Sequence, residues 1–144
     1  MPASPTGTRR RLVLASASPA RLATLRAAGV DPEVIVSGVD ESDVDGLPAA
    51  EHALVLARRK AGHVAQGLED RDDRPLVLGC DSVLELDGEV FGKPGTADVA
   101  RERWQRMRGR TGVLHTGHCV AEVGSGRTAS GTASTVVHFA DLSD

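Results

Sequence analysis

The chain contains 144 residues, of which 40% are hydrophobic and 26% are charged. This composition is typical of one soluble globular domain that buries a core. The formal net charge of -3 gives no attraction to a nucleic-acid polymer or an anionic membrane, so we expect neither as a partner. One Trp, two Phe and no Tyr also disfavour binding by stacking on aromatic side chains.

The two cysteines, Cys80 and Cys119, lie far apart and form no C-x-x-C motif. We therefore expect two packed thiols in a reducing compartment, without a disulfide or a structural zinc site. The sequence has no apolar segment typical of a signal peptide or long enough to cross a bilayer, so we expect a cytoplasmic protein. A disordered leader is predicted over 1–10, followed by one domain over 11–144.

The first half of the chain alternates strand and helix patterns. An apolar strand from Leu12 leads to a helix from Pro19 to about Ala28, a second strand over 33–37 and a long helix from Pro48 to about Ala65. The apolar stripe of the long helix consists of Ala53, Leu56, Ala57, Ala61 and Val64. Between the second strand and this helix, residues 39–45 form an acidic loop.

The second half contains most of the predicted strands. A buried strand over 76–81 is followed by a hairpin of 83–86 and 89–91 around Asp87-Gly88, a type I′ turn signal. A helix from Ala97 to about Arg108 and an antiparallel pair over 113–123 and 128–139 complete the predicted elements. Residues 141–144 resemble the start of a further helix.

The junction between the first strand and first helix can bind a phosphate. Ser18 is a good N-cap and Pro19 suits the first helical position, while Ser16 and Arg21 add a hydroxyl and a guanidinium. Free backbone N–H groups and the positive end of the helix dipole favour an anion there. The alternative is a plain capped helix with Arg21 facing solvent.

Further polar residues can complete a phosphate and metal site. Glu41 lies in the acidic loop, Lys60 in the long helix, Asp81 at a strand end and Lys93 in a Gly/Pro turn. Carboxylates suit Mg²⁺ or Mn²⁺, and lysines neutralise phosphates. Taken singly, an acidic loop or a helical lysine is more often solvated, but a carboxylate after a buried strand is costly unless it is paired.

Six ordered groups of residues carry a family resemblance. They are 14–21 (LASASPAR), 39–41 (VDE), 79–83 (GCDSV) with 86–89 (LDGE), 92–94 (GKP), 109–111 (GRT) and 115–117 (HTG). In this order, over residues 12–142, the chain closely resembles the Maf family of nucleoside triphosphate pyrophosphatases. The resemblance implies an α/β fold of the Maf/inosine-triphosphatase type, with a twisted mixed sheet flanked by helices and two lobes around a central cleft.

The resemblance also implies an activity: metal-dependent cleavage of a nucleoside triphosphate between the α and β phosphates. Asp81 matches the family's proton acceptor and metal-site aspartate, and Glu41 matches its loop carboxylate. Lys60 and Lys93 match its phosphate-binding lysines, while Ser16, Ser18 and Arg21 match its phosphate loop. The expected metal is Mg²⁺ or Mn²⁺, held by Glu41 and Asp81, and the expected assembly is a homodimer.

The sequence departs from the family pattern in three ways. Ala20 stands where many members have arginine, and Cys80 and Ser82 replace the commoner alanine and threonine around Asp81. Members also usually continue beyond the position of Asp144, so the resemblance implies a domain incomplete at its C-terminus. The alternative function is therefore a catalytically weak nucleotide-binding or cell-division regulatory protein, and base preference stays open. A P-loop kinase or a dinucleotide oxidoreductase is disfavoured because neither glycine-rich motif is present.

Overall fold

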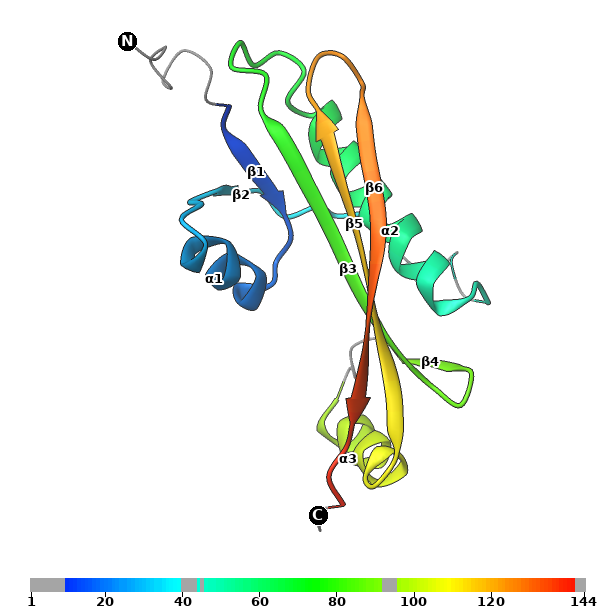
Figure 1. Cartoon of the computed structure of the whole chain (residues 1–144). Helices are drawn as coiled ribbons and strands as arrows, with labels where there is room; N and C mark the ends of the chain where they lie inside the picture. The colour runs from blue at the N-terminus through cyan, green and yellow to red at the C-terminus, as the bar shows by residue number, and fades with distance from the viewer. Residues whose placement is uncertain (1–9, 40–43, 45, 92–95, 142–144) are drawn as a thin grey trace.

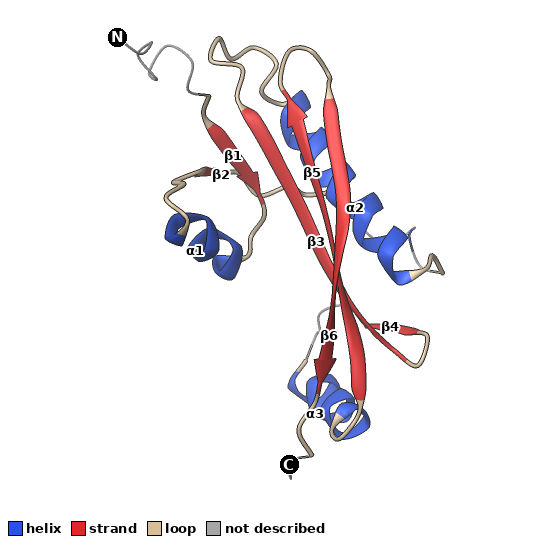
Figure 2. Ribbon diagram, in the orientation of Figure 1, coloured by secondary structure: helices blue, strands red, loops and turns tan. Residues whose placement is uncertain are grey.

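A computed structural model describes residues 10–39, 44, 46–91 and 96–141. Its three helices are α1 (Pro19–Ala27), α2 (Ala49–Gln66) and α3 (Ala97–Met107). Its strands are β1 (Leu12–Ala15), β2 (Glu33–Val34), β3 (Leu76–Leu86), β4 (Glu89–Phe91), β5 (Thr111–Glu122) and β6 (Thr128–His138). The fold is mixed α/β, which confirms the predicted class (Figure 2).

One sheet contains all six strands. Its order is β2-β1-β3-β5-β6, and β4 pairs with the end of β3. The β1–β2 and β1–β3 pairs are parallel, whereas β3–β4, β3–β5 and β5–β6 are antiparallel. The long strands β3, β5 and β6 cross with a strong twist, with α1 and α2 toward one end and α3 toward the other (Figure 1).

The predicted elements agree with the structure except in two strands. The predicted strand over 76–81 does not end at Asp81, because β5 pairs with β3 without a break from Leu76 to Glu85. The predicted strand over 33–37 is reduced to Glu33–Val34, since the short β1 pairs with only these two residues. At the β3–β4 turn, Asp87 and Gly88 have φ values of 52° and 79°, as the predicted type I′ turn requires.

Helix α2 packs very closely on the sheet. Its predicted apolar stripe is buried, and Ala57, Ala61 and Val64 share a core with Val13, Val77 and Cys119. A Cβ atom on Gly79 would lie 2.3 Å from the backbone oxygen of Ala57, and one on Gly117 would lie 2.4 Å from that of Ala53. Glycines on two neighbouring strands therefore set how near α2 approaches.

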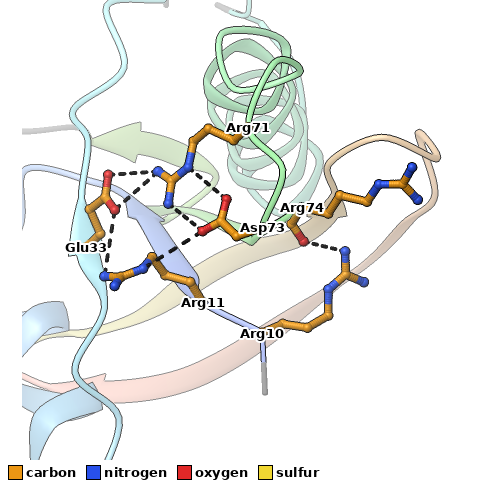
Figure 3. Close-up of polar contacts among 6 residues, drawn as sticks. All are labelled: Arg10, Arg11, Glu33, Arg71, Asp73 and Arg74. Atoms are coloured by element: carbon orange, nitrogen blue, oxygen red, sulfur yellow. Dashed lines mark hydrogen bonds and ion pairs between the residues drawn. The ribbon is translucent and has the colours of Figure 1, made fainter. Parts of the chain in front are cut away.

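A surface ion-pair group joins β2 to the connector before β3 (Figure 3). The Arg71 guanidinium donates to both Glu33 and Asp73, at 3.0 and 2.7 Å to their nearest carboxylate oxygens. Arg11 approaches the same two carboxylates at 3.8 and 4.0 Å. The hydrogen bond from Arg71 lowers the pKa of Asp73 below its usual value. Such exposed pairs fix a loop more than they stabilise the fold.

The two ends of the predicted domain are described only in part. Of the predicted leader over 1–10, only Arg10 lies within the described residues, and its guanidinium donates to Glu122 and to the backbone oxygen of Arg74. Of 141–144, only Asp141 is described. None of the helices in the described ranges is long and apolar enough to span a bilayer.

Candidate functional site

A cavity of about 640 Å³ opens where β1 ends. The last β1–β3 pair is Ala15 with Gly79, and on that edge β4 pairs with β3 only from Leu84, so among the described strands none lies beside this edge of β3 between Gly79 and Leu84. The cavity is lined by Ala15, Ser16, Ala17, Ser18, Arg21, Val36, Ser37, His52, Leu56, Lys60, Asp81, Ser82, Val83, Leu84, Phe91 and Leu114. Five of the seven residues predicted for the site are therefore brought together: Ser16, Ser18, Arg21, Lys60 and Asp81.

The turn from β1 to α1 forms one wall of this cavity. Ser16 is only 6% exposed, and its hydroxyl oxygen accepts from the backbone N–H of Ser18 at 3.2 Å. The Ser18 hydroxyl accepts from the backbone N–H of Arg21 at 3.3 Å, and Pro19 occupies the first turn of the helix. This confirms the predicted cap and directs the start of α1 toward the cavity.

The side chain of Arg21 folds back into the site. Its guanidinium donates to the Ser16 hydroxyl at 3.1 Å, to the Cys80 carbonyl at 3.4 Å and to the Ser82 hydroxyl at 2.9 Å. The alternative of an arginine facing solvent is therefore wrong. Three hydrogen bonds, two to β3 and one to the turn before α1, hold the charge in the cavity.

Lys60 reaches the same place from α2. Its ammonium donates to Asp81 Oδ1 at 2.9 Å and to the Cys80 carbonyl at 3.5 Å. The two side chains of this ion pair are 15% and 14% exposed, so water screens it only partly. Because α2 packs against Gly79 and side chains alternate along β3, Asp81 lies on the α2 face and Ser82 on the other.

The described part of the lining is cationic. Arg21 and Lys60 approach the Cys80 carbonyl from opposite faces of β3, and Asp81 is the one carboxylate among the described lining residues. Two positive charges beside one negative charge, in a partly buried hollow that also has serine hydroxyls and a helix start, favour an anion such as a phosphate.

Cys80, between Gly79 and Asp81, takes part in the site through its backbone oxygen, which accepts from Arg21 and Lys60. Its side chain is 8% exposed, and burial raises the pKa of the thiol, although Arg21 and Lys60 oppose that shift. A neutral buried thiol is a poor nucleophile. Both Cys80 and Cys119 are free and buried, in agreement with the prediction of packed thiols.

Two predicted site residues, Glu41 and Lys93, lie outside the described residues. Within the described ranges, no three His, Cys, Asp or Glu side chains gather closely enough to hold a metal ion. The predicted meeting of Glu41 with Asp81 therefore stays a prediction.

Sequence reasoning missed a pair of hydroxyls behind Arg21. Ser82 on β3 is paired in register with Thr116 on β5, and their hydroxyl oxygens are 2.9 Å apart. Both residues belong to segments that carry the family resemblance, 79–83 and 115–117, which was the available signal. The pairing itself depends on the register between β3 and β5, which cannot be read from the residues of these two segments.

Known proteins resemble this chain over most of its length. A family model described as Maf-like protein matches residues 11–144. A nucleoside triphosphate pyrophosphatase from Salinispora tropica is 60% identical over 135 residues, which cover 93% of this chain and 60% of the relative. One from Streptomyces avermitilis is 58% identical over 136 residues, which cover 94% of this chain and 65% of that protein. The chain thus spans less than two thirds of the length of these relatives.

A solved structure shares the fold. The structure of a HAM1 protein from Coxiella burnetii matches with a TM-score of 0.59 and 19% identity. The match covers 93% of this chain and 75% of the other. At that identity, the match supports the arrangement of helices and strands alone.

Proposed function

The chain belongs to the Maf family, and we propose that it is a nucleoside triphosphate pyrophosphatase that hydrolyses the bond between the α and β phosphates. The products are a nucleoside monophosphate and pyrophosphate. The observation that carries the proposal is the meeting of Arg21 and Lys60 at the Cys80 carbonyl, directly beside Asp81. The similar proteins from Salinispora tropica and Streptomyces avermitilis are named for the same pyrophosphatase activity, which supports the proposal.

We propose that the triphosphate binds against the β1–α1 turn. The hydroxyls of Ser16 and Ser18 and the backbone N–H groups at the start of α1 bind phosphate oxygens, and Arg21 and Lys60 neutralise their charge. The lining also includes apolar side chains, among them Val36, Leu84 and Leu114. The less polar part of the nucleotide contacts such side chains.

Asp81 is the proposed general base. Its carboxylate is mostly buried, is oriented by Lys60 at 2.9 Å and lines the same cavity as the phosphate-binding groups. From there it can orient a water molecule toward the α phosphorus and accept its proton while the pyrophosphate group leaves. Lys60 stabilises the negative charge that develops on the phosphate chain.

We also propose that Mg²⁺ or Mn²⁺ takes part. A hard cation of this kind is usually held by one or two carboxylates together with substrate phosphates and water, and Asp81 supplies one such carboxylate in the cavity. Glu41 is the proposed second carboxylate and Lys93 a further phosphate ligand. When bound, the ion supplies charge neutralisation on the phosphate chain and activation of water.

Three further parts of the proposal rest on the family resemblance. The substrates are surplus or non-canonical nucleotides, the protein acts as a homodimer, and it acts in the cytoplasm. Among the described strands, β6 pairs with β5 alone and is largely exposed, so it offers an edge on which such an assembly can form. Light scattering of the purified chain at several concentrations measures its oligomeric state.

A panel of canonical and modified nucleoside triphosphates tests the activity. We expect pyrophosphate and the monophosphate as the products, loss of turnover on chelation of divalent ions, and recovery on adding Mg²⁺ or Mn²⁺. Identification of the products by ³¹P NMR shows which phosphate bond was cleaved. Release of orthophosphate with the diphosphate would contradict the proposal, and nucleotide binding without turnover would favour the catalytically weak alternative.

A further inference from the structure

We infer that Thr116 and Ser82 are positioning residues, which set Arg21 and the start of α1 for binding of the phosphate chain. This inference rests on the proposed phosphate-binding role of the cavity. Thr116, Ser82 and Arg21 form an unbroken series of hydrogen bonds from the centre of the sheet to the first turn of α1. None of the roles proposed above uses Thr116.

The geometry of the series is specific. Ser82 Oγ accepts from Arg21 Nη2 at 2.9 Å and shares a hydrogen bond with Thr116 Oγ1, also at 2.9 Å. Because Ser82 and Thr116 are direct partners in the β3–β5 register, the two hydroxyls meet without distortion of either strand. A serine whose oxygen accepts from a guanidinium can give its own hydrogen to Thr116, which fixes the hydroxyl orientation.

The need for such a series comes from how weakly α1 is packed. None of the nine residues of α1 is buried, so apolar contacts do little to fix its position. Arg21 instead connects α1 to β3 through the Cys80 carbonyl and the Ser82 hydroxyl, and to the turn before α1 through Ser16. Whatever holds the guanidinium therefore also holds the backbone N–H groups at the start of α1.

Thr116 gives the sharpest test because it is not among the residues that line the cavity. A ligand in the cavity meets Ser82 and Arg21, whereas Thr116 acts on it only through Ser82. A change of anion affinity in a Thr116 variant thus reports positioning and not direct contact.

The experiment measures the affinity of the chain for tripolyphosphate by calorimetry in metal-free buffer. We expect Ser82→Ala to raise Kd about tenfold, because a hydrogen bond from a charged group is lost. Thr116→Val should raise it about fivefold, as expected for one neutral hydrogen bond. Ser82→Thr and Thr116→Ser keep the hydroxyls and should restore affinity close to that of the unchanged chain.

Thr111→Val is the matched control. Thr111 is on the same strand, and its hydroxyl is 2.9 Å from His138 Nδ1, so the variant also loses a cross-strand hydrogen bond, but away from Arg21. Hydrogen exchange gives a second measurement: Thr116→Val should speed exchange in the first turn of α1 while α2 keeps its protection.

The outcomes separate this inference from the proposed enzyme activity. If the unchanged chain binds tripolyphosphate but hydrolyses no nucleotide, the proposed activity fails and the positioning role is still measured. Affinity in Thr116→Val equal to that of the unchanged chain overturns the inference. An equal loss in Thr111→Val, or absence of tripolyphosphate binding by the unchanged chain, overturns it as well.

Discussion

Helices α1 and α2 stand beside the same sheet but are held in different ways. Six residues of α2 are buried, and the helix lies so close to β3 and β5 that Gly79 and Gly117 leave no room for a side chain. No residue of α1 is buried, and its cap and the Arg21 hydrogen bonds hold it instead. Lys60 and Asp81 are thus placed by packing, whereas Ser16, Ser18 and Arg21 are placed by polar contacts, which open more easily.

The packed region can be tested at one of its two glycine contacts with α2. In Gly117→Ala the new Cβ would lie 2.4 Å from the backbone oxygen of Ala53, so the helix and the strand must separate. We expect the free energy of unfolding to fall by about 3 kcal/mol in chemical denaturation.

Gly62→Ala is the control for this change. Gly62 lies within α2, and a Cβ there would have nothing within 4 Å. We expect that variant to gain about 1 kcal/mol from helix propensity. Unchanged stability in Gly117→Ala would show that close packing of α2 is not what holds this region.

The ion pair between Lys60 on α2 and Asp81 on β3 gives the next largest effect. Lys60→Met leaves the Asp81 carboxylate, whose side chain is 14% exposed, without its 2.9 Å partner. We expect a loss of about 2 kcal/mol in the free energy of unfolding. Arg58→Met removes an exposed cation of the same helix that donates to Ser130, and it should cost far less. Equal losses in both variants would contradict the special position of Lys60.

Loss of a polar contact of α1 should destabilise that helix and not the whole fold. Ser18→Ala removes the hydroxyl that accepts from the Arg21 N–H, so it should cost α1 about 1 kcal/mol. We expect faster hydrogen exchange in α1 and an almost unchanged midpoint of global unfolding, since no residue of α1 is fully buried. Thr96→Ala removes the equivalent cap of α3 and should leave α1 unaffected. A drop in the global midpoint as large as that of Gly117→Ala would place α1 within the packed unit.

The smallest effect concerns the exposed ion pairs of Figure 3. The hydrogen bond from Arg71 lowers the pKa of Asp73 in the folded state, so the pair contributes stability above the ordinary carboxyl pKa of 3.8. That contribution is lost as the pH falls through the lowered pKa. Asp73→Asn should therefore lower Tm slightly at neutral pH and not at all in strong acid. Asp72→Asn, one residue earlier, is the control. A larger fall in Tm for Asp73→Asn in acid than at neutral pH would contradict this prediction.

The same contrast explains what the sequence could predict. The apolar spacing of α2, the cap at Ser18-Pro19 and the turn at Asp87-Gly88 are local patterns, and the structure confirms each of them. The bond between Ser82 and Thr116 joins residues 34 positions apart and depends on strand register. The continuity of β3 was missed because the polar residues Asp81 and Ser82 interrupt its apolar pattern. The sequence does not show that β5 pairs with β3 on both sides of this interruption.

The central claim is that Asp81 performs chemistry on a phosphate chain bound by groups from both regions. The most direct measurement is pyrophosphate release by Asp81→Asn, compared with Glu85→Gln. Glu85 lies on the same strand four residues later, contacts His115 at 3.2 Å and is not among the cavity-lining residues. We predict that Asp81→Asn loses at least about 100-fold in rate and that Glu85→Gln stays near the unchanged chain. Full turnover in a folded Asp81→Asn variant would contradict the account.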